Sequence, residues 1–266
     1  MKNIIVITGA SSGIGREFAE LLDKKEKVDE IWVLARRLDR LEELKNVLST
    51  PVKPVSIDLS NVENIKEYKK MLDDEGANVK MLVNCSGFGK FNHYENISDE
   101  VNQNMIDLNI KAVVAMTDAT LPHIGKGGKI INIASCAAFQ PIPYINIYAA
   151  TKAFVLSYTR ALNVELKYKN ITVTAVCPYW TKTEFFDRAI VKDEKTVIIN
   201  YGVMYDPKKV VLKAYKDNLK GKDISVYGGK NNIQKFFAKI LPHKLVMKIW
   251  CGMQKFNGTP DIAERK

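Results

Sequence analysis

Thr8-Gly9-Ala10-Ser11-Ser12-Gly13-Ile14-Gly15 joins a β-branched run, Asn3–Thr8, to a segment of helical periodicity, Gly13–Lys27. Glycines at these spacings let a chain turn sharply out of a strand and approach a ligand closely. The free N–H groups and the dipole of the following helix favour an anion there. A turn without a ligand remains an alternative. The stretch predicts a pyrophosphate contact by Gly9, Ser11, Ser12, Gly13, Ile14 and Gly15.

Further strand-like runs alternate with helical patterns along the chain. The predicted strands after the first are Glu30–Ala35, Val52–Ile57, Val79–Asn84, Lys129–Ala134, Ile171–Val176 and Asp223–Tyr227. Further predicted helices are Leu38–Leu48, Asn61–Glu75, Asp99–Leu121, Tyr144–Lys169 and Pro207–Leu219, with a capping box at Ser60 and Glu63 and an N-cap at Ser98. This alternation predicts an α/β fold, a doubly wound parallel sheet of about seven strands covered by helices on both faces.

Length and composition indicate one globular domain spanning 1–266, since 46% of the residues are hydrophobic and 26% are charged. The four cysteines are far apart and form no C-x-x-C pair, so neither a metal site nor a disulfide framework is predicted. No signal h-region or membrane span is found. A cytoplasmic protein is therefore expected.

The net charge of +10 is concentrated near the C-terminus. Lys and Arg outnumber Asp and Glu by only 26 to 25 in residues 1–202, but by 14 to 5 in residues 203–266. A basic tail suits an acidic partner, an anionic substrate or a membrane surface, or it is a solvated face. Scarce arginine and the lack of a recognisable module argue against nucleic acid.

Two basic amphipathic segments make up the end of this tail, a C-terminal helical extension over 230–266. They are Ile233–Leu241 and Lys244–Trp250, and Pro242 separates them because a helix interior does not tolerate proline. Three interpretations stay open: the pair caps a pocket, lies on a membrane interface, or packs on the body or a second subunit. Residues 182–206 are the expected mobile excursion.

The second predicted strand ends in Ala35-Arg36-Arg37, and no carboxylate occurs between Ile31 and Leu38. In a dinucleotide-binding sheet, an acidic residue here accepts bonds from the ribose hydroxyls, whereas a basic one accommodates a 2′-phosphate. The sequence therefore favours NADP(H), with Arg36 as the first candidate and Arg37 as the second. The alternative is that both are exposed residues at a helix start.

Tyr148-Ala149-Ala150-Thr151-Lys152 places a phenol and an ammonium four residues apart on one helix face. An adjacent ammonium would lower the pKa of the phenol and make it a useful acid or base. Ser135, just past the strand Lys129–Ala134, could reach the same pocket.

With these motifs, the sequence resembles the short-chain dehydrogenase/reductase family of NAD(P)-dependent, Rossmann-type oxidoreductases over about residues 3–184 and the last strand. Thr8–Gly15 resembles the family's glycine turn. The resemblance implies a catalytic tetrad of Asn109, Ser135, Tyr148 and Lys152. It also implies cofactor contacts by Asp58, Leu59, Asn84, Ser86, Gly87, Pro178, Thr181 and Thr183, beside Tyr148 and Lys152.

In the implied mechanism, Ser135 stabilises charge on the substrate oxygen and Tyr148 exchanges its proton. Lys152 lowers the pKa of Tyr148 and binds the nicotinamide ribose, and Asn109 holds a relay water. Tyr179 stands where the family usually has glycine after Pro178, which hints at an aromatic wall.

Aromatic residues flanking these segments are the candidates for a substrate pocket, although each could equally belong to the core: Tyr144, Tyr179, Trp180, Phe185 and Phe186. They would suit a lipophilic or amphipathic ketone or alcohol of steroid, bile acid or 3-oxoacyl type. A homodimer or homotetramer is expected from the resemblance, through the Asp99–Leu121 and Tyr144–Lys169 helices. Outside this class, a non-catalytic NADP-binding regulator and a membrane-surface adaptor are the alternatives.

Overall fold

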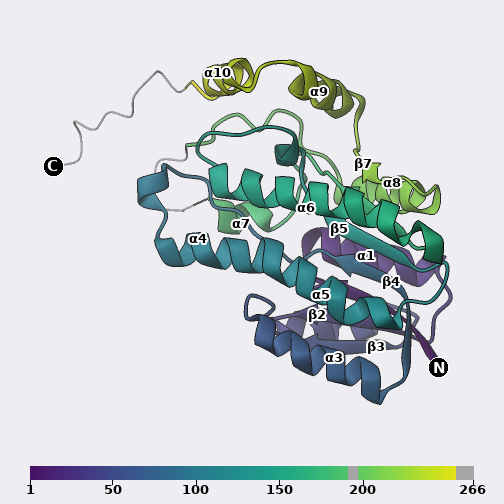
Figure 1. The fold of residues 1–266 in the computed structure, drawn as a ribbon. Helices are drawn as coiled ribbons and strands as arrows, with labels where there is room; N and C mark the ends of the chain where they lie inside the picture. Colours follow the sequence, from purple (N-terminus) through teal and green to yellow (C-terminus); the bar gives the residue numbers. More distant parts are fainter. Residues whose placement is uncertain (191–196, 256–266) are drawn as a thin grey trace.

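A computed structural model of the protein describes residues 1–190 and 197–255. Within those residues, seven strands form one parallel sheet in the order β3-β2-β1-β4-β5-β6-β7 (Figure 1). The strands are β1 (Lys2–Thr8), β2 (Glu30–Ala35), β3 (Val52–Ser56), β4 (Ala77–Asn84), β5 (Lys129–Ile133), β6 (Thr172–Val176) and β7 (Ile224–Ser225). The winding direction reverses between β1 and β4, so the predicted doubly wound sheet is confirmed.

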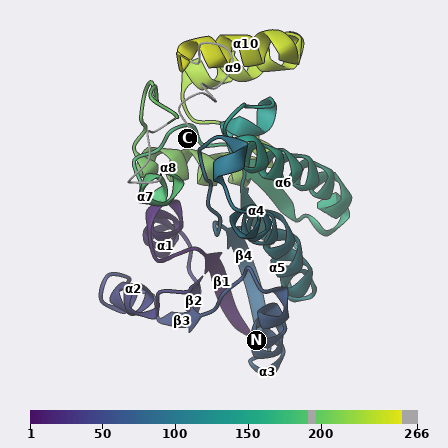
Figure 2. The same ribbon diagram turned by 90° about the vertical axis from the view of Figure 1, so that its left-hand side faces the viewer.

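Helices cover both faces of the sheet (Figure 2). One face carries α1 (Gly13–Lys25), α2 (Leu38–Glu42) and α8 (Pro207–Leu219). The other carries α3 (Ile65–Asp74), α4 (Asp99–Ile106), α5 (Ala112–Thr120) and α6 (Asn146–Glu165). A short helix, α7 (Phe185–Ala189), and two C-terminal helices, α9 (Gly229–Ile240) and α10 (His243–Met253), complete the described chain.

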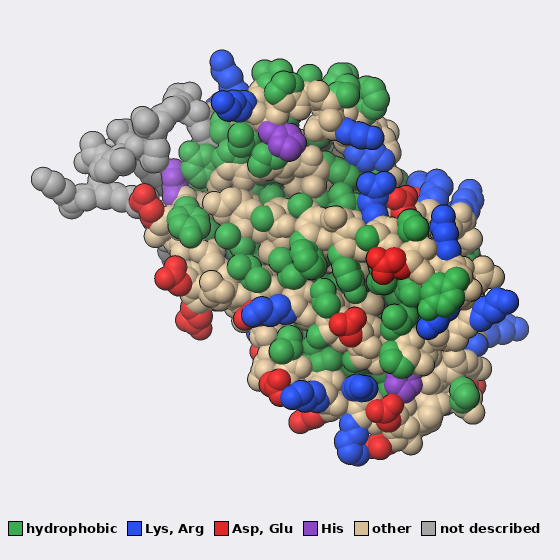
Figure 3. Space-filling model, viewed as in Figure 1, with side chains coloured by type: hydrophobic (Ala, Val, Ile, Leu, Met, Phe, Trp, Pro, Cys, Tyr) green, Lys and Arg blue, Asp and Glu red, His purple; other side chains and the backbone are tan. Residues whose placement is uncertain are grey.

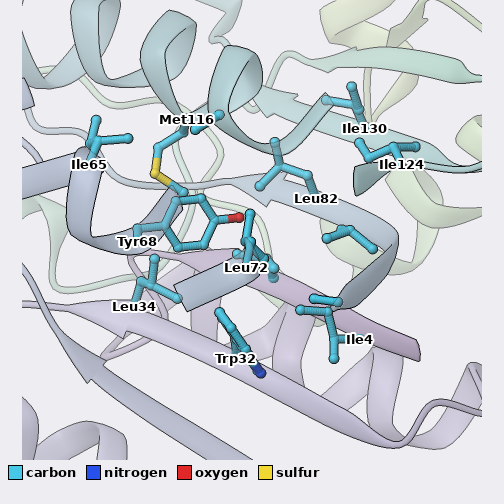
Figure 4. Packing of buried hydrophobic residues seen from close by; sticks show 14 of the residues in the cluster. Ile4, Trp32, Leu34, Ile65, Tyr68, Leu72, Leu82, Met116, Ile124 and Ile130 are labelled. Atoms are coloured by element: carbon cyan, nitrogen blue, oxygen red, sulfur yellow. The ribbon is translucent and has the colours of Figure 1, made fainter. Parts of the chain in front are cut away.

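Each face has its own apolar core because the strands of a doubly wound sheet are buried on both sides. Beneath α3 and α5, Trp32 packs edge-on against Tyr68, with ring centroids 6.4 Å apart (Figure 4). The Tyr68 hydroxyl shares a 2.8 Å hydrogen bond with Thr120 Oγ1, which satisfies a buried polar group. Phe18 and Leu22 of α1 lie in the core of the opposite face.

The structure differs from the predicted elements mainly at their ends. The predicted helix Asp99–Leu121 is interrupted by a π-helical turn at Asp107–Lys111, which periodicity alone does not reveal. The predicted Asn61–Glu75 helix starts differently as well: the Asn61 side chain, not the predicted Ser60 box, accepts from Glu63 N at 3.1 Å. The predicted Ser98 cap is confirmed, since Ser98 Oγ accepts from Val101 N at 3.3 Å.

The C-terminal extension forms two helices that separate at Pro242, as the sequence predicts. Both views show α9 and α10 as a layer of their own beyond α6 (Figures 1 and 2). The last part of the predicted 230–266 extension, 256–266, lies outside the described residues, as does 191–196 of the predicted excursion 182–206.

Candidate active site

The turn between β1 and α1 is a close-packed backbone cradle. Gly9 and Gly13 have φ of +66° and +53°, in the region that favours glycine. A Cβ at Gly15 would lie 2.3 Å from the carbonyl oxygen of Gly9, so a side chain there would collide with backbone. Thr8 Oγ1 accepts from both Cys85 N and Ser86 N at 3.0 Å, which ties the end of β4 to the turn.

A cavity of about 610 Å³ lies beyond the carboxyl ends of the strands, next to the turn. This is where an open α/β sheet binds its ligands. Most residues that the sequence singles out line the cavity: Gly9, Ser11, Ser12, Gly13, Ile14, Gly15, Arg36, Arg37, Asp58, Leu59, Ser86, Gly87, Ser135, Tyr148, Lys152, Pro178, Tyr179, Trp180, Thr181, Thr183, Phe185 and Phe186. The fold thus brings the glycine turn and the Ser135, Tyr148 and Lys152 group to one space.

Two predicted site residues are not part of the cavity lining: Asn84, a predicted cofactor contact, and Tyr144, a candidate for the substrate pocket. Buried Asn84 donates through Nδ2 to Asn132 Oδ1 at 2.9 Å and so ties β4 to β5. Tyr144 has a left-handed φ of 68°, and its ring meets His93 edge-on at a centroid distance of 4.8 Å rather than lining the cavity. Both side chains therefore act outside the cavity wall.

Asn109, the predicted holder of a relay water, is fully buried on the π-helical turn. Its Oδ1 accepts from Phe88 N at 3.0 Å, and its Nδ2 donates to Phe88 O at 2.9 Å and to Thr151 Oγ1 at 3.1 Å. The side-chain amide is thus engaged by protein groups. It fixes the loop after β4 and the first turns of α6, which carries Tyr148.

Ser135 and Tyr148 both line the cavity, and the Ser135 hydroxyl is close enough to the Tyr148 phenol to influence its pKa. Ser135 stands at the end of β5, where its Oγ also accepts from Ala137 N at 3.1 Å. Lys152 lies one turn after Tyr148 on α6, and its Nζ donates to the Ile133 carbonyl oxygen at 2.8 Å. Two hydroxyls and an ammonium therefore converge on one end of the cavity.

The pKa of Tyr148 differs in direction from the sequence-based expectation. Burial raises the pKa of this phenol to about 12, and the nearby Ser135 side chain opposes that shift only in part. Burial also lowers the pKa of Lys152 to about 8. Lys152 does not contribute the expected lowering of the Tyr148 pKa in this structure, and its ammonium donates to the Ile133 carbonyl oxygen instead. The phenol is consequently protonated across the neutral range.

Aromatic rings build the far wall of the cavity. Phe91, which the sequence did not single out, does not line the cavity but supports the rings that do: it meets Trp180, Phe185 and Tyr148 at centroid distances of 5.8, 6.0 and 6.2 Å. Trp250 of α10 closes this wall, and its Nε1 donates to the carbonyl oxygen of Pro143 at 3.2 Å. The wall is apolar and rigid, so it suits an apolar part of a ligand.

Three arginines gather at the opposite end of the cavity. Arg37 donates to Glu184 Oε2 and to Ser11 Oγ, both at 3.1 Å, and Arg36 Nη1 lies 3.9 Å from Asp58 Oδ2. The third is Arg188 of α7, whose pKa is lowered by burial and by the charges of Arg36 and Arg37. The sequence analysis missed Arg188 because this residue follows the Pro178–Thr183 motif and belongs to no motif of its own.

Comparison with known protein families identifies the family of this chain. A family model described as short chain dehydrogenase matches residues 3–194. The chain belongs to this family. An uncharacterized oxidoreductase of Staphylococcus epidermidis is 35% identical over 66% of this chain and 77% of its own. The 17-beta-hydroxysteroid dehydrogenase type 3 of Mus musculus is also 35% identical, over 67% of this chain but only 60% of its own.

Solved structures of dehydrogenases share this fold. A short-chain dehydrogenase from Sphingobium yanoikuyae in complex with NADPH has a TM-score of 0.74 and 25% identity, covering 91% of this chain and 97% of that one. A serine dehydrogenase complexed with NADP⁺ has a TM-score of 0.73 and 30% identity, covering 84% and 93%. The protein is thus an oxidoreductase of the short-chain dehydrogenase family.

We also searched the described residues of this short-chain dehydrogenase for a metal site and for a membrane-spanning helix. Across residues 1–190 and 197–255, no group of His, Cys, Asp and Glu could hold a metal ion. None of the helices in those ranges combines the length and apolar character that crossing a membrane requires.

Proposed function

We propose that this short-chain dehydrogenase uses NADP(H) to interconvert a ketone and a secondary alcohol on a lipophilic or amphipathic substrate. The observation that carries the proposal is that Ser135, Tyr148 and Lys152 line the same cavity as the glycine turn. The bound nicotinamide would supply and accept the hydride. The protein residues would supply orientation, charge and the proton.

The cradle fits a dinucleotide. Gly9, Gly13 and Gly15 leave the backbone bare where a pyrophosphate would lie, and α1 directs its free N–H groups to that place. Ser11, Ser12 and Ile14 complete the turn. Further residues of the cavity lining would contact the rest of the cofactor: Leu59, Ser86, Gly87, Pro178, Thr181 and Thr183.

The arginine group supports NADP(H) over NAD(H). Arg36 and Arg37 follow β2, where a carboxylate would be needed for the ribose hydroxyls of NAD(H), and none occurs from residue 31 to 38. Arg188 adds a third guanidinium at the same place, so a 2′-phosphate would relieve the repulsion among the three. Asp58, paired with Arg36, is then placed to orient that guanidinium or to contact adenine.

The polar residues would divide the chemistry among them. Ser135 would hold the substrate oxygen, and Tyr148, protonated at neutral pH, would donate its proton in ketone reduction. Lys152 would bind the nicotinamide ribose and would help to return a proton to Tyr148 after that donation. Asn109 would contribute through the structure that it fixes around Phe88 and Thr151, because its side-chain amide is already engaged.

The aromatic wall supports a large apolar group next to the reacting oxygen. The aromatic residues that line the cavity besides Tyr148 and Phe88 are Tyr179, Trp180, Phe185, Phe186 and Trp250. Phe91 packs against Trp180 and Phe185 without lining the cavity itself. The names of several relatives fit this shape: hydroxysteroid dehydrogenase in mouse and very-long-chain 3-oxoacyl-CoA reductase in Danio rerio. Steroid, bile acid and 3-oxoacyl ketones are therefore the proposed substrate class.

NADPH oxidation with a panel of ketones tests the proposal. We expect turnover with bulky lipophilic ketones, and activity on small polar sugars alone would contradict the substrate class. NADPH binding without turnover on any ketone would favour the non-catalytic regulator instead. A homodimer or homotetramer through α4, α5 and α6 and a cytoplasmic location belong to the same proposal, and light scattering tests the first of them.

A further inference from the structure

The C-terminal layer is fixed to the body by its inner side. Trp250 of α10 is buried and bonded to Pro143, and Gln254 accepts through Oε1 from Ile199 N at 3.0 Å and from Asn200 N at 2.9 Å. Ala238 of α9 is buried as well. This side also contributes Gln234 and Trp250 to the cavity, so α9 and α10 lie at its border.

The outer side of the same helices is apolar and exposed. On α9, Ile233, Phe236, Phe237 and Ile240 recur at the i, i+3, i+4, i+7 spacing of one helix face, and are 59%, 60%, 48% and 59% exposed. Leu245, Ile249 and Met253 continue the surface on α10, and we call these seven residues the α9–α10 face. Amphipathic helices of a free globular protein direct such a face inward.

The exposed hydrophobic residues of the α9–α10 face are clustered and not scattered over the surface. Seven of the eighteen large hydrophobic side chains that are exposed among the described residues lie in this short stretch. Figure 3 shows hydrophobic side chains along the outer edge of the layer, with lysines among them. A contiguous exposed apolar surface of this kind marks an interaction site.

Lysines border the α9–α10 face and no carboxylate accompanies them. Residues 229–255 contain six lysines and neither Asp nor Glu. Lys239, Lys244 and Lys248 are exposed, and each immediately precedes an exposed apolar residue, Ile240, Leu245 or Ile249. One residue is a rotation of roughly 100° on a helix, so these ammonium groups flank the apolar stripes. Long lysine side chains can reach anionic groups while their neighbours are buried.

We propose that the α9–α10 face docks on an anionic lipid surface. Such a surface offers an apolar interior for the Phe and Ile side chains and negative headgroups for the flanking lysines. A second copy of this chain fits less well, because a two-fold contact would set the same uncompensated lysines against each other. The helices are too short to span a bilayer and would lie in its interface.

Docking in this orientation would place the cavity next to the lipid. Gln234 and Trp250 border the cavity from the inner side of the very helices whose outer side would be immersed. A lipophilic ketone dissolved in the membrane would then reach Tyr148 without crossing much water. This last step rests on the proposed function, whereas docking itself does not.

Vesicle flotation of the full chain tests the docking. We expect the protein to float with vesicles of phosphatidylcholine and phosphatidylglycerol and to remain largely unbound with phosphatidylcholine alone. Phe236→Ser with Ile240→Ser should abolish flotation. Lys244→Gln with Lys248→Gln should lower the partition coefficient by about tenfold or more, and added salt should lower it for the wild type.

Matched control variants show whether flotation depends on the α9–α10 face itself or only on the total charge and exposed apolar surface of the protein. Lys167→Gln with Lys169→Gln removes the same charge from exposed positions on another surface, and Tyr168→Ser with Leu219→Ser removes exposed apolar groups there. Both should float like the wild type. Equal losses in these controls, no flotation of the wild type, or dissociation of an oligomer by Phe236→Ser with Ile240→Ser would overturn the inference. Flotation needs no turnover, so an inactive enzyme would still test it.

Discussion

The Nζ of Lys152 lies 5.7 Å from the centre of the Tyr148 ring. The hydrogen bond that this ammonium donates goes to the Ile133 carbonyl oxygen, at 2.8 Å, and not to the Tyr148 hydroxyl. The two groups therefore share one buried site without direct pairing. Both groups line the cavity, and we propose that the nicotinamide ribose binds beside them.

Burial of Lys152 makes stability depend on pH. Its pKa falls from the ordinary 10.5 to about 8 on folding, so the unfolded chain binds more protons between these values. Stability from this group is complete above pH 10.5 and is lost as pH falls through 8. Lys152→Met should therefore stabilise the protein relative to wild type at pH 7. That advantage should shrink by on the order of 3 kcal/mol towards pH 10.5.

Urea unfolding of the wild type and of Lys152→Met at several pH values measures the difference between their free energies of unfolding. Groups that titrate in the same way in both proteins do not contribute to this difference. Lys167→Met, at an exposed position, is the control and should show no such trend. A constant difference between wild type and Lys152→Met from pH 7 to 10.5 would show that Lys152 titrates normally.

Tyr148→Phe should remove the proton donor and leave the cavity wall intact. We expect kcat for ketone reduction to fall by at least about a hundredfold, while NADPH still binds with nearly wild-type affinity. Steady-state kinetics and fluorescence titration with NADPH measure the two effects. Tyr168→Phe, at an exposed position, should change neither. Wild-type turnover by Tyr148→Phe would reject the proposed proton donor.

Arg36→Asp should shift the enzyme from NADPH towards NADH. The change removes a charge-assisted contact to the 2′-phosphate and supplies a carboxylate for the ribose hydroxyls, so the ratio of kcat/KM for NADPH to that for NADH should fall by on the order of tenfold to hundredfold. Arg188→Ala should lower the same ratio less, because it only removes a charge. Arg40→Ala, which also loses one charge but does not line the cavity, should leave the ratio unchanged.

Local sequence signals predicted much of this molecule because they reflect local physical needs. Turn glycines and alternating β-branched runs predicted the doubly wound parallel sheet, although not the order of its strands. The Tyr148 to Lys152 spacing, with Ser135 just past a strand, predicted a shared pocket, and all three residues line one cavity. The π-helical turn at Asp107–Lys111 was missed because one inserted residue barely changes hydrophobic periodicity.

Contacts between distant segments could not be predicted in the same way. Arg188 and Trp250 reach the cavity from segments without a recognisable motif, and their approach depends on packing that one sequence does not encode locally. The raised pKa of Tyr148 has the same origin: spacing shows a neighbouring amine, whereas burial, which decides the direction, is a property of the folded state.

Gly15→Ala should disrupt the cradle at its tightest point. The new Cβ would lie 2.3 Å from the Gly9 carbonyl oxygen, so the turn must open to admit it. We expect a loss of about 1–3 kcal/mol in the free energy of unfolding and a larger fractional loss of NADPH affinity, since the shifted backbone N–H groups no longer face the pyrophosphate. Gly252→Ala is the matched control, because its Cβ meets no atom within 4 Å. Urea unfolding and NADPH titration of both variants measure the effects, and tight NADPH binding by Gly15→Ala would place the pyrophosphate elsewhere.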